Sequence, residues 1–246
     1  RFGEYLIHES ISIRDLTKIL VEGKSINRYL TIPEGISKYE LIQLLKKIDK
    51  KFNINSVNEI SDLILADTYS YNFFDGAESI IKNISQKSYS RIKHLWDKKK
   101  DYIPLNSISE LLIISSIIEK ETGKKSEKNK IAGVFYNRLN SNMRLQSDPT
   151  VVYALRMGKN LNRKLLRKDL KIDSEYNTYR NKGLTPGPIS IPGIESVKAA
   201  LNPYMSNFFY FVADKKGGHL FSENYSEHLR NIEFVKKQVY WYETRK

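Results

Sequence analysis

The sequence predicts an α+β protein, with a small β-α-β-α module followed by a larger mixed helical part that contains a β-hairpin near the C-terminus. Three observations support this class. Strand-like segments alternate with amphipathic helices over roughly the first fifty residues. Helical periodicity dominates residues 107–157, and two aromatic segments flank a Gly-Gly turn within 208–222. A chain of 246 residues with 40% hydrophobic residues can bury cores of this size.

The N-terminal module is predicted from alternating strand and helix signals. Residues 3–8 and 26–32 have strand-like patterns. A helix is expected between them over 12–23, because it starts at a serine that can cap it and ends at a glycine. A second helix is expected at 37–48, where Ser37 stands three residues before a glutamate in a capping box.

The remaining elements follow from periodicity and from turn residues. Apolar residues recur at helical spacing in several segments, and aromatic strands at 208–213 and 219–222 predict the hairpin. Most of the seven prolines lie within 149–203, so we expect a long loop there, and such loops often bind ligands. The further helices are expected at about 75–99, 107–122, 131–139 and 225–241.

The composition limits the possible functions. Lys and Arg number 41 against 28 Asp and Glu, giving a net charge of +13, which favours polyanionic partners without choosing among nucleic acid, anionic lipid and an acidic wall polymer. With no cysteine, disulfides, thiolate metal sites and cysteine nucleophiles are excluded. No apolar run approaches the roughly 18 residues of a membrane helix. His219 and His228 have no third ligand nearby in sequence, so no metal site is predicted.

The helix at 107–122 carries the first candidate for chemistry. It is apolar almost all the way round, which predicts burial. Glu119 shares a face with core-type residues, whereas Glu121 lies about 200° further round the helix and is expected to point elsewhere. Loss of hydration favours the protonated form of a carboxyl group, which a general acid requires. The alternative is that Glu119 lies at the end of the helix and pairs with a base.

Polar and aromatic residues in the following segments could hold a sugar, because aromatic rings stack on sugar faces and amides bind hydroxyl and N-acetyl groups. Asp148 precedes Pro149 and is explained equally well as a helix cap. Arg138 could belong to a site, although polar residues on a solvated face are more common. The candidate binding residues are Gln146, Asp148, Thr150, Tyr176, Asn177, Thr178 and Pro188.

Several short sequence motifs, taken together and in order, are a more specific family signature than any one of them. They are Ile-Ile-Glu-Lys-Glu-Thr at 117–122, Gly-Val-Phe-Tyr-Asn-Arg-Leu at 133–139, Leu-Gln-Ser-Asp-Pro-Thr at 145–150, Tyr-Asn-Thr-Tyr at 176–179, Gly-Leu-Thr-Pro-Gly-Pro-Ile at 183–189, and Tyr-Phe-Val-Ala-Asp at 210–214 with Gly-Gly-His at 217–219. Together they closely resemble the YceG-like family of endolytic murein transglycosylases, from about residue 60 onward. The resemblance implies a LysM-like module at 1–52 and a YceG-like catalytic domain at 53–246.

The resemblance also implies an activity and a cellular location. It implies a bacterial enzyme that cleaves nascent peptidoglycan glycan strands internally, beside peptidoglycan synthases, without a metal or other cofactor. An N-terminal membrane helix, absent from this sequence, would hold it on the outer face of the cytoplasmic membrane. The family's catalytic glutamate is the first of the Glu-Lys-Glu-Thr string, which is Glu119 here. This residue would protonate the glycosidic oxygen and then take the proton of the muramic 6-hydroxyl, leaving 1,6-anhydro ends.

Two departures from the family pattern leave alternatives open. Residues 63–66 read Leu-Ile-Leu-Ala where relatives have a glycine-aromatic-Phe-Pro stretch, and Thr185 replaces a proline. An inactive peptidoglycan-binding scaffold of the same fold is one alternative, and a hydrolytic muramidase is another. A nucleic-acid-binding module is a third, suggested by charge alone, and no RNP, zinc-finger or helix-turn-helix pattern supports it.

Overall fold

The computed structural model describes residues 3–23, 25–54 and 59–243, which form helices and two small antiparallel sheets of two strands each. The predicted α+β class is therefore confirmed. Among the described residues, the α-helices are α1 (Ile13–Glu22), α2 (Lys38–Ile48), α3 (Ala77–Trp96), α4 (Ile108–Glu121), α5 (Lys125–Asn140), α6 (Asp148–Arg156), α7 (Ile194–Leu201) and α8 (Tyr225–Glu243).

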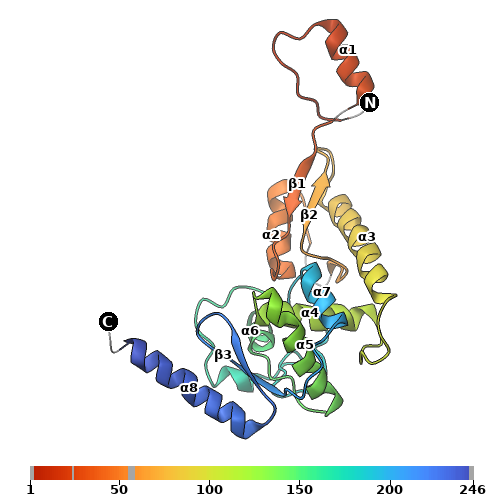
Figure 1. Cartoon of the computed structure of the whole chain (residues 1–246). Helices are drawn as coiled ribbons and strands as arrows, with labels where there is room; N and C mark the ends of the chain where they lie inside the picture. Colours follow the sequence, from red (N-terminus) through yellow and green to blue (C-terminus); the bar gives the residue numbers. More distant parts are fainter. Residues whose placement is uncertain (1–2, 24, 55–58, 244–246) are drawn as a thin grey trace.

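The two sheets lie in different parts of the molecule. β1 (Arg28–Thr31) pairs antiparallel with β2 (Thr68–Tyr71), and β3 (Tyr210–Ala213) pairs antiparallel with β4 (His219–Ser222) as the predicted hairpin. Figure 1 shows an elongated arrangement in which α1 lies at one end, β1, β2, α2 and α3 come next, and α4 to α7 follow. The β3–β4 hairpin and α8 lie at the end far from α1.

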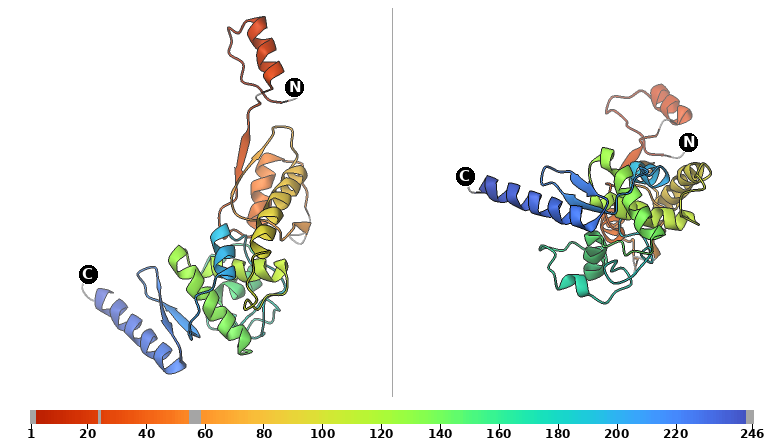
Figure 2. Two further views of the ribbon diagram at one scale, coloured as in Figure 1. Left: turned by 45° about the vertical axis from the view of Figure 1, so that its right-hand side comes forward. Right: turned by 60° about the horizontal axis from the view of Figure 1, so that its bottom comes forward.

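Helix α1 stands apart from the rest of the fold, as both views in Figure 2 show. Ser12 caps its start, and Gly23 ends it in a left-handed conformation with φ of 70°, both as predicted. None of its residues is buried. The prediction of a strand at residues 3–8 is wrong, because the segment is irregular. Although Ile26 N–H donates to the Glu4 carbonyl at 2.7 Å, no strand among the described residues pairs with this segment to form a ladder.

One hydrophobic core joins β1, β2, α2 and α3. The capping box at Ser37 forms as predicted, and α2 buries Leu41 and Leu45 against the sheet. Helix α3 contributes Ile80 and Ile84 to the same core. Since β2 lies beyond residue 52, the β1–β2 pairing links the two sides of the expected domain boundary, and the division at that residue stays a prediction.

The second core is built around α4. Every residue from Leu111 to Ile118 is buried, which confirms the burial predicted from its uniformly apolar surface. Helices α5, α6 and α7 pack around it. Gly133 of α5 lies against the backbone of Tyr204, because a Cβ at that position would come within 2.3 Å of the Tyr204 carbonyl oxygen. This close approach needs glycine.

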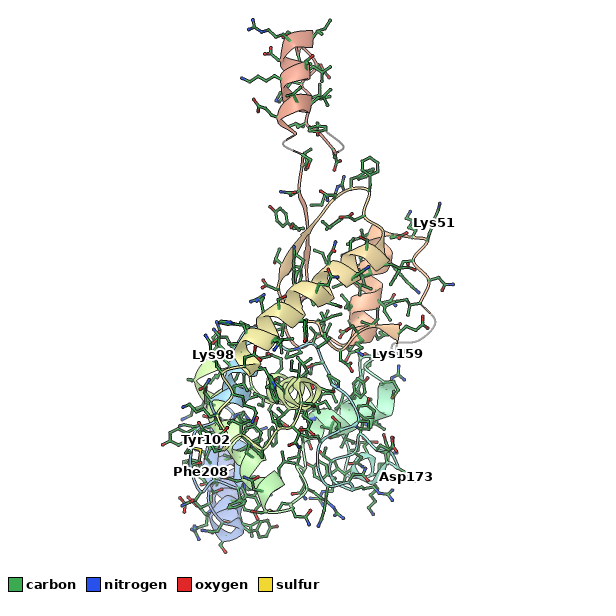
Figure 3. All side chains as sticks on the ribbon, turned by 90° about the vertical axis from the view of Figure 1, so that its right-hand side faces the viewer. Lys51, Lys98, Tyr102, Lys159, Asp173 and Phe208 are labelled. Atoms are coloured by element: carbon green, nitrogen blue, oxygen red, sulfur yellow. The ribbon has the colours of Figure 1, made fainter. Side chains whose placement is uncertain are left out.

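The two cores meet along a short backbone seam. Gly35 N–H donates to the Ile191 carbonyl at 2.9 Å, and Ile191 N–H donates to Ile36 at 2.7 Å. Ala66 N–H donates to Pro192 at 2.9 Å, so the 63–66 departure from the family pattern lies at this seam. Figure 3 shows Lys159 at the level of the seam, where its ammonium lies 5.1 Å from the Tyr39 ring centroid.

The C-terminal part consists of the long loop, the hairpin and α8. The loop expected between α6 and α7 holds one short 3-10 helix, η2 (Asp169–Lys171). Tyr210 of β3 stacks on His228 of α8 with ring centroids 5.1 Å apart, which fixes the helix against the hairpin. No helix within the described ranges combines the length and apolar character needed to cross a membrane.

Candidate active site

A cavity of about 370 Å³ opens where α4 ends, α6 begins and β3 passes. Its walls combine carboxylate, guanidinium, amide, imidazole and aromatic groups, a mixture suited to a polar ligand with apolar faces. The lining residues are Glu121, Arg138, Leu145, Gln146, Asp148, Tyr179, Tyr210, Phe211, Val212, Ala213, His219, Tyr225 and His228. Of the residues predicted from sequence, the cavity brings together Gln146 and Asp148.

Glu121 is the carboxylic acid at the centre of this arrangement. As the last residue of α4, it reaches from the helix end into the cavity, where the Ser147 hydroxyl donates to it. The pKa of Glu121 is raised to about 7, chiefly by burial and also by the negative charge of Asp148, against the lowering effects of the Ser147 hydrogen bond and of Arg138. Glu121 can therefore hold a proton near neutral pH and release it, as a general acid must.

Glu119 is placed quite differently. Its Oε1 accepts from Lys128 Nζ at 2.8 Å, and the two side chains are only 5% and 2% exposed. Its Oε2 accepts from Gly193 N–H at 2.9 Å and from Ser196 Oγ at 2.6 Å. Both oxygens are thus bound within the protein, and Glu119 does not line the cavity. This geometry does not support Glu119 as a proton donor, and it matches the alternative of a carboxylate paired with a base.

The three charged residues of the Glu-Lys-Glu string diverge. Glu119 binds α5 and α7, and Lys120 Nζ donates across the seam to the Gly35 carbonyl at 3.2 Å. Glu121 alone turns to the cavity. Because α4 is surrounded by protein, more than one of its faces is an inner face, so helical spacing could not choose between the two glutamates.

Asp148 is not the helix cap that the sequence predicted. The N-cap of α6 is Ser147, and Asp148 is the first helical residue. Its side chain is therefore free to face the cavity, where Asp148 Oδ1 accepts from the Tyr179 hydroxyl at 2.6 Å. Gln146, just before the cap, has φ of 51°. A non-glycine residue in this conformation is strained and is common at functional sites.

Three of the predicted binding residues, Thr150, Asn177 and Thr178, hold residues 146–148 in place by hydrogen bonds. Thr178 accepts from Ser147 N–H at 3.0 Å through its hydroxyl, which also lies 2.8 Å from the Thr150 hydroxyl. The Thr178 carbonyl accepts from Gln146 N–H at 3.1 Å. Asn177 donates to the carbonyls of residues 170 and 172 and accepts from Tyr179 N–H. All three side chains are buried outside the cavity, so they position residues 146–148.

Tyr176 and Pro188 lie elsewhere. They line a separate cavity of about 470 Å³ next to the seam, together with Tyr153, whose ring centroid lies 4.8 Å from that of Tyr176. The structure therefore does not bring them to Glu121.

Some cavity residues were not selected from the sequence. Arg138 was considered for a site but not chosen, because a solvated face is the more common case; it is buried, and it donates to the carbonyls of Phe209 at 2.6 Å and Leu145 at 2.7 Å. Its place within the Gly-Val-Phe-Tyr-Asn-Arg-Leu string was the available signal. Tyr179 likewise lies in the Tyr-Asn-Thr-Tyr string at 176–179, whereas His228 offered no signal beyond its residue type. In the part of the chain that the structure describes, no group of three or more metal-binding side chains is close enough to hold a metal ion.

Comparison with known proteins supports this fold. Residues 1–234 match the model of the YceG-like family. The chain is 37% identical to an endolytic murein transglycosylase of Bacillus subtilis, over 85% of this chain and 62% of that protein. It is 31% identical to an endolytic murein transglycosylase of Streptococcus pneumoniae, over 94% of this chain and 50% of that protein. The chain thus spans about half to three fifths of these relatives.

A solved structure is also similar. The crystal structure of a yceG-like protein from Listeria monocytogenes superimposes with a TM-score of 0.69 at 33% identity, covering 88% of this chain and 80% of the other. The family match extends over nearly the whole chain, including every string from which the cavity is built. The chain therefore belongs to the YceG-like family.

Proposed function

We propose that this protein is an endolytic lytic transglycosylase of peptidoglycan, with Glu121 as its catalytic acid. The observation that carries the proposal is a glutamic acid with a pKa of about 7 in a cavity lined by amide, guanidinium and aromatic groups. The names of the two relatives, each an endolytic murein transglycosylase, support the reaction class. Murein glycan strands are the proposed substrate.

The proposed reaction needs one carboxyl group. Protonated Glu121 gives its proton to the glycosidic oxygen between muramic acid and glucosamine, and the bond from that oxygen to muramic C1 breaks. The resulting Glu121 carboxylate takes the proton of the 6-hydroxyl on the same muramic residue, and this oxygen bonds to C1. A 1,6-anhydro end forms, and Glu121 is protonated again. The attack is intramolecular, so no bound water is required.

The neighbours of Glu121 have distinct proposed roles. The Asp148 carboxylate lies beside the site, where its charge favours the protonated form of Glu121 and would stabilise the positive charge that develops at C1. Tyr179 holds the Asp148 carboxylate in place through its hydroxyl. Gln146, with its side chain presented by a strained backbone, is placed to bind sugar hydroxyl or N-acetyl groups.

A hydrolytic muramidase is the second candidate, and Asp148 is the observation that favours it. Asp148 lines the same cavity as Glu121 and is not used as a cap, so it could act as the base that activates water. Inverting glycosidases use such a second carboxylate.

The remaining parts of the proposal concern the rest of the chain and its surroundings. We propose that the N-terminal region is LysM-like, supported by the packing of β1 and α2 in one core, with β2 completing the sheet. Since peptidoglycan is assembled outside the cytoplasmic membrane, the proposal places the cavity on the extracytoplasmic side, at that membrane and near the synthases.

The test is a digestion of uncrosslinked glycan strands followed by mass spectrometry. The proposal expects internal cuts with 1,6-anhydro-muramic ends. Reducing ends, heavier by the roughly 18 Da of one water, would instead establish the hydrolytic reaction. No cleavage by the folded protein would contradict both and leave the peptidoglycan-binding scaffold.

A further inference from the structure

One wall of the cavity that holds Glu121 is formed by strand β3. Four successive residues of β3, Tyr210 to Ala213, all line the cavity, whereas β4 contributes only His219. Side chains of successive strand residues point to opposite faces of a sheet. A cavity that contacts all four must therefore lie along the edge of β3 that faces away from β4.

The backbone groups on that edge can be identified from the register. Asp214 N–H donates to the Gly218 carbonyl at 2.8 Å, so this pair is hydrogen-bonded. Hydrogen-bonded and non-hydrogen-bonded pairs alternate along an antiparallel ladder. Ala213, opposite His219, and Phe211, opposite Phe221, therefore direct their N–H and C=O groups away from β4.

Neighbouring elements cover the two faces of the hairpin but leave this edge open. On one face, the Phe211 ring contacts Phe135 of α5, with centroids 6.0 Å apart. On the other, Tyr210 stacks on His228 of α8 at 5.1 Å. Within the described residues, β3 pairs with β4 alone. The unpaired backbone groups thus face the cavity that holds Glu121.

We propose that this edge binds the stem peptide of the substrate, whose amide groups hydrogen-bond along the edge to the backbone of Phe211 and Ala213. This inference rests on the proposed function. The muramic residue whose C1 bond is cleaved carries the peptide on its lactyl group, so the peptide begins close to Glu121. The outward groups of Phe211 and Ala213 are two residues apart, roughly 7 Å, so a ligand with several backbone amides can bind both residues at once.

A sugar N-acetyl group fits the same edge less completely. It offers one N–H and one C=O, which could occupy the outward groups of one residue, whereas a peptide can use both Phe211 and Ala213. Stem peptides also carry carboxylate groups. The turn after β3 begins with Asp214, whose Oδ1 accepts from the backbone N–H groups of Lys216 and Gly218. Lys215 and Lys216, both exposed in this turn, place positive charge next to the edge. The number of amide groups and the charge of the turn therefore both favour the peptide.

The test uses two substrates and two variants of the full chain. The substrates are glycan strands that carry stems and the same strands after an amidase has removed the stems. Ala213→Pro removes the outward N–H without touching the ladder to β4, and proline is tolerated at such edge positions. Ala213→Val changes the side chain but keeps the N–H. Circular dichroism and thermal unfolding verify that both variants fold.

The measured quantity is the ratio of cleavage rates on stem-bearing and stem-free strands. We expect a ratio of at least about tenfold for the unmodified protein, a fall of roughly two- to tenfold in Ala213→Pro, and no fall in Ala213→Val. Equal rates on both substrates, or the same fall in both variants, would overturn the inference while the proposed function stands. Cleavage of neither substrate would contradict the proposed function. The inference would then be decided by whether a free stem tripeptide shifts the amide NMR signals of Phe211 and Ala213.

Discussion

Replacing Glu119 with glutamine is expected to destabilise the protein, because it leaves the buried Lys128 ammonium without its counter-charge. The two side chains are 5% and 2% exposed, so water cannot replace the lost partner. Breaking a buried ion pair from one side costs about 3–5 kcal/mol, and the glutamine oxygen can still accept a hydrogen bond, so we expect about 3 kcal/mol. For a chain of this size, that corresponds to a fall in Tm of roughly 6–12 °C.

The assay is chemical and thermal unfolding of Glu119→Gln, Lys128→Met and the double variant. The double variant leaves no unpaired charge, so it is expected to recover at least about 1.5 kcal/mol relative to the sum of the single changes. If Glu119→Gln unfolds like the unmodified protein, or if the two changes are simply additive, the ion pair is not the structural link between α4, α5 and α7 that we infer.

Three further results are expected. Since Glu121 must be protonated in the free enzyme, kcat/KM should fall as pH rises above about 7. Asp148→Asn removes a charge that raises the pKa of Glu121, so it should move that fall to lower pH. A pH profile unchanged by Asp148→Asn would refute this. The pKa of Glu121 is higher when folded than the ordinary 4.5, so stability contributed by its protonated form is lost as pH rises from 4.5 through 7. Glu121→Gln should therefore be more stable than the unmodified protein at pH 8, by up to about 3 kcal/mol, and not at pH 4, as urea titrations at both pH values would show. Gly133→Ala should lower the free energy of unfolding by roughly 1–3 kcal/mol, because the added Cβ meets the Tyr204 carbonyl oxygen. Gly123→Ala, whose Cβ would have no atom within 4 Å, should not lower it. Equal urea midpoints for the two variants would contradict this packing.

Local signals in the sequence were enough for most of the fold. Ser37 and Ser107 cap their helices because serine followed three residues later by glutamate satisfies free N–H groups within a few residues. The apolar surface of α4 predicted its burial, and the Gly-Gly turn predicted the hairpin. The strand at 3–8 failed because a strand needs a partner, which no local pattern supplies.

The sequence predicted most of the segments that form the candidate site, whereas the proton donor proposed here, Glu121, differs from the predicted Glu119, which stays untested. The strings around Gln146, Asn177 and Thr178 do converge, although the last two support the loop and do not line the cavity. The choice between Glu119 and Glu121 depends on Lys128 and on α7, which are brought to α4 only by tertiary packing. Helical spacing within α4 contains no information about either neighbour.

The central claim is that Glu121, and not Glu119, is the proton donor. The most direct measurement is the rate of glycan-strand cleavage by Glu121→Gln and Glu119→Gln, taken at a temperature where unfolding curves show both variants to be fully folded. We expect Glu121→Gln to lose at least about a hundredfold in rate, as removal of a general acid does, and Glu119→Gln to stay within about tenfold of the unmodified protein. A folded Glu119→Gln without activity, beside an active Glu121→Gln, would contradict the account.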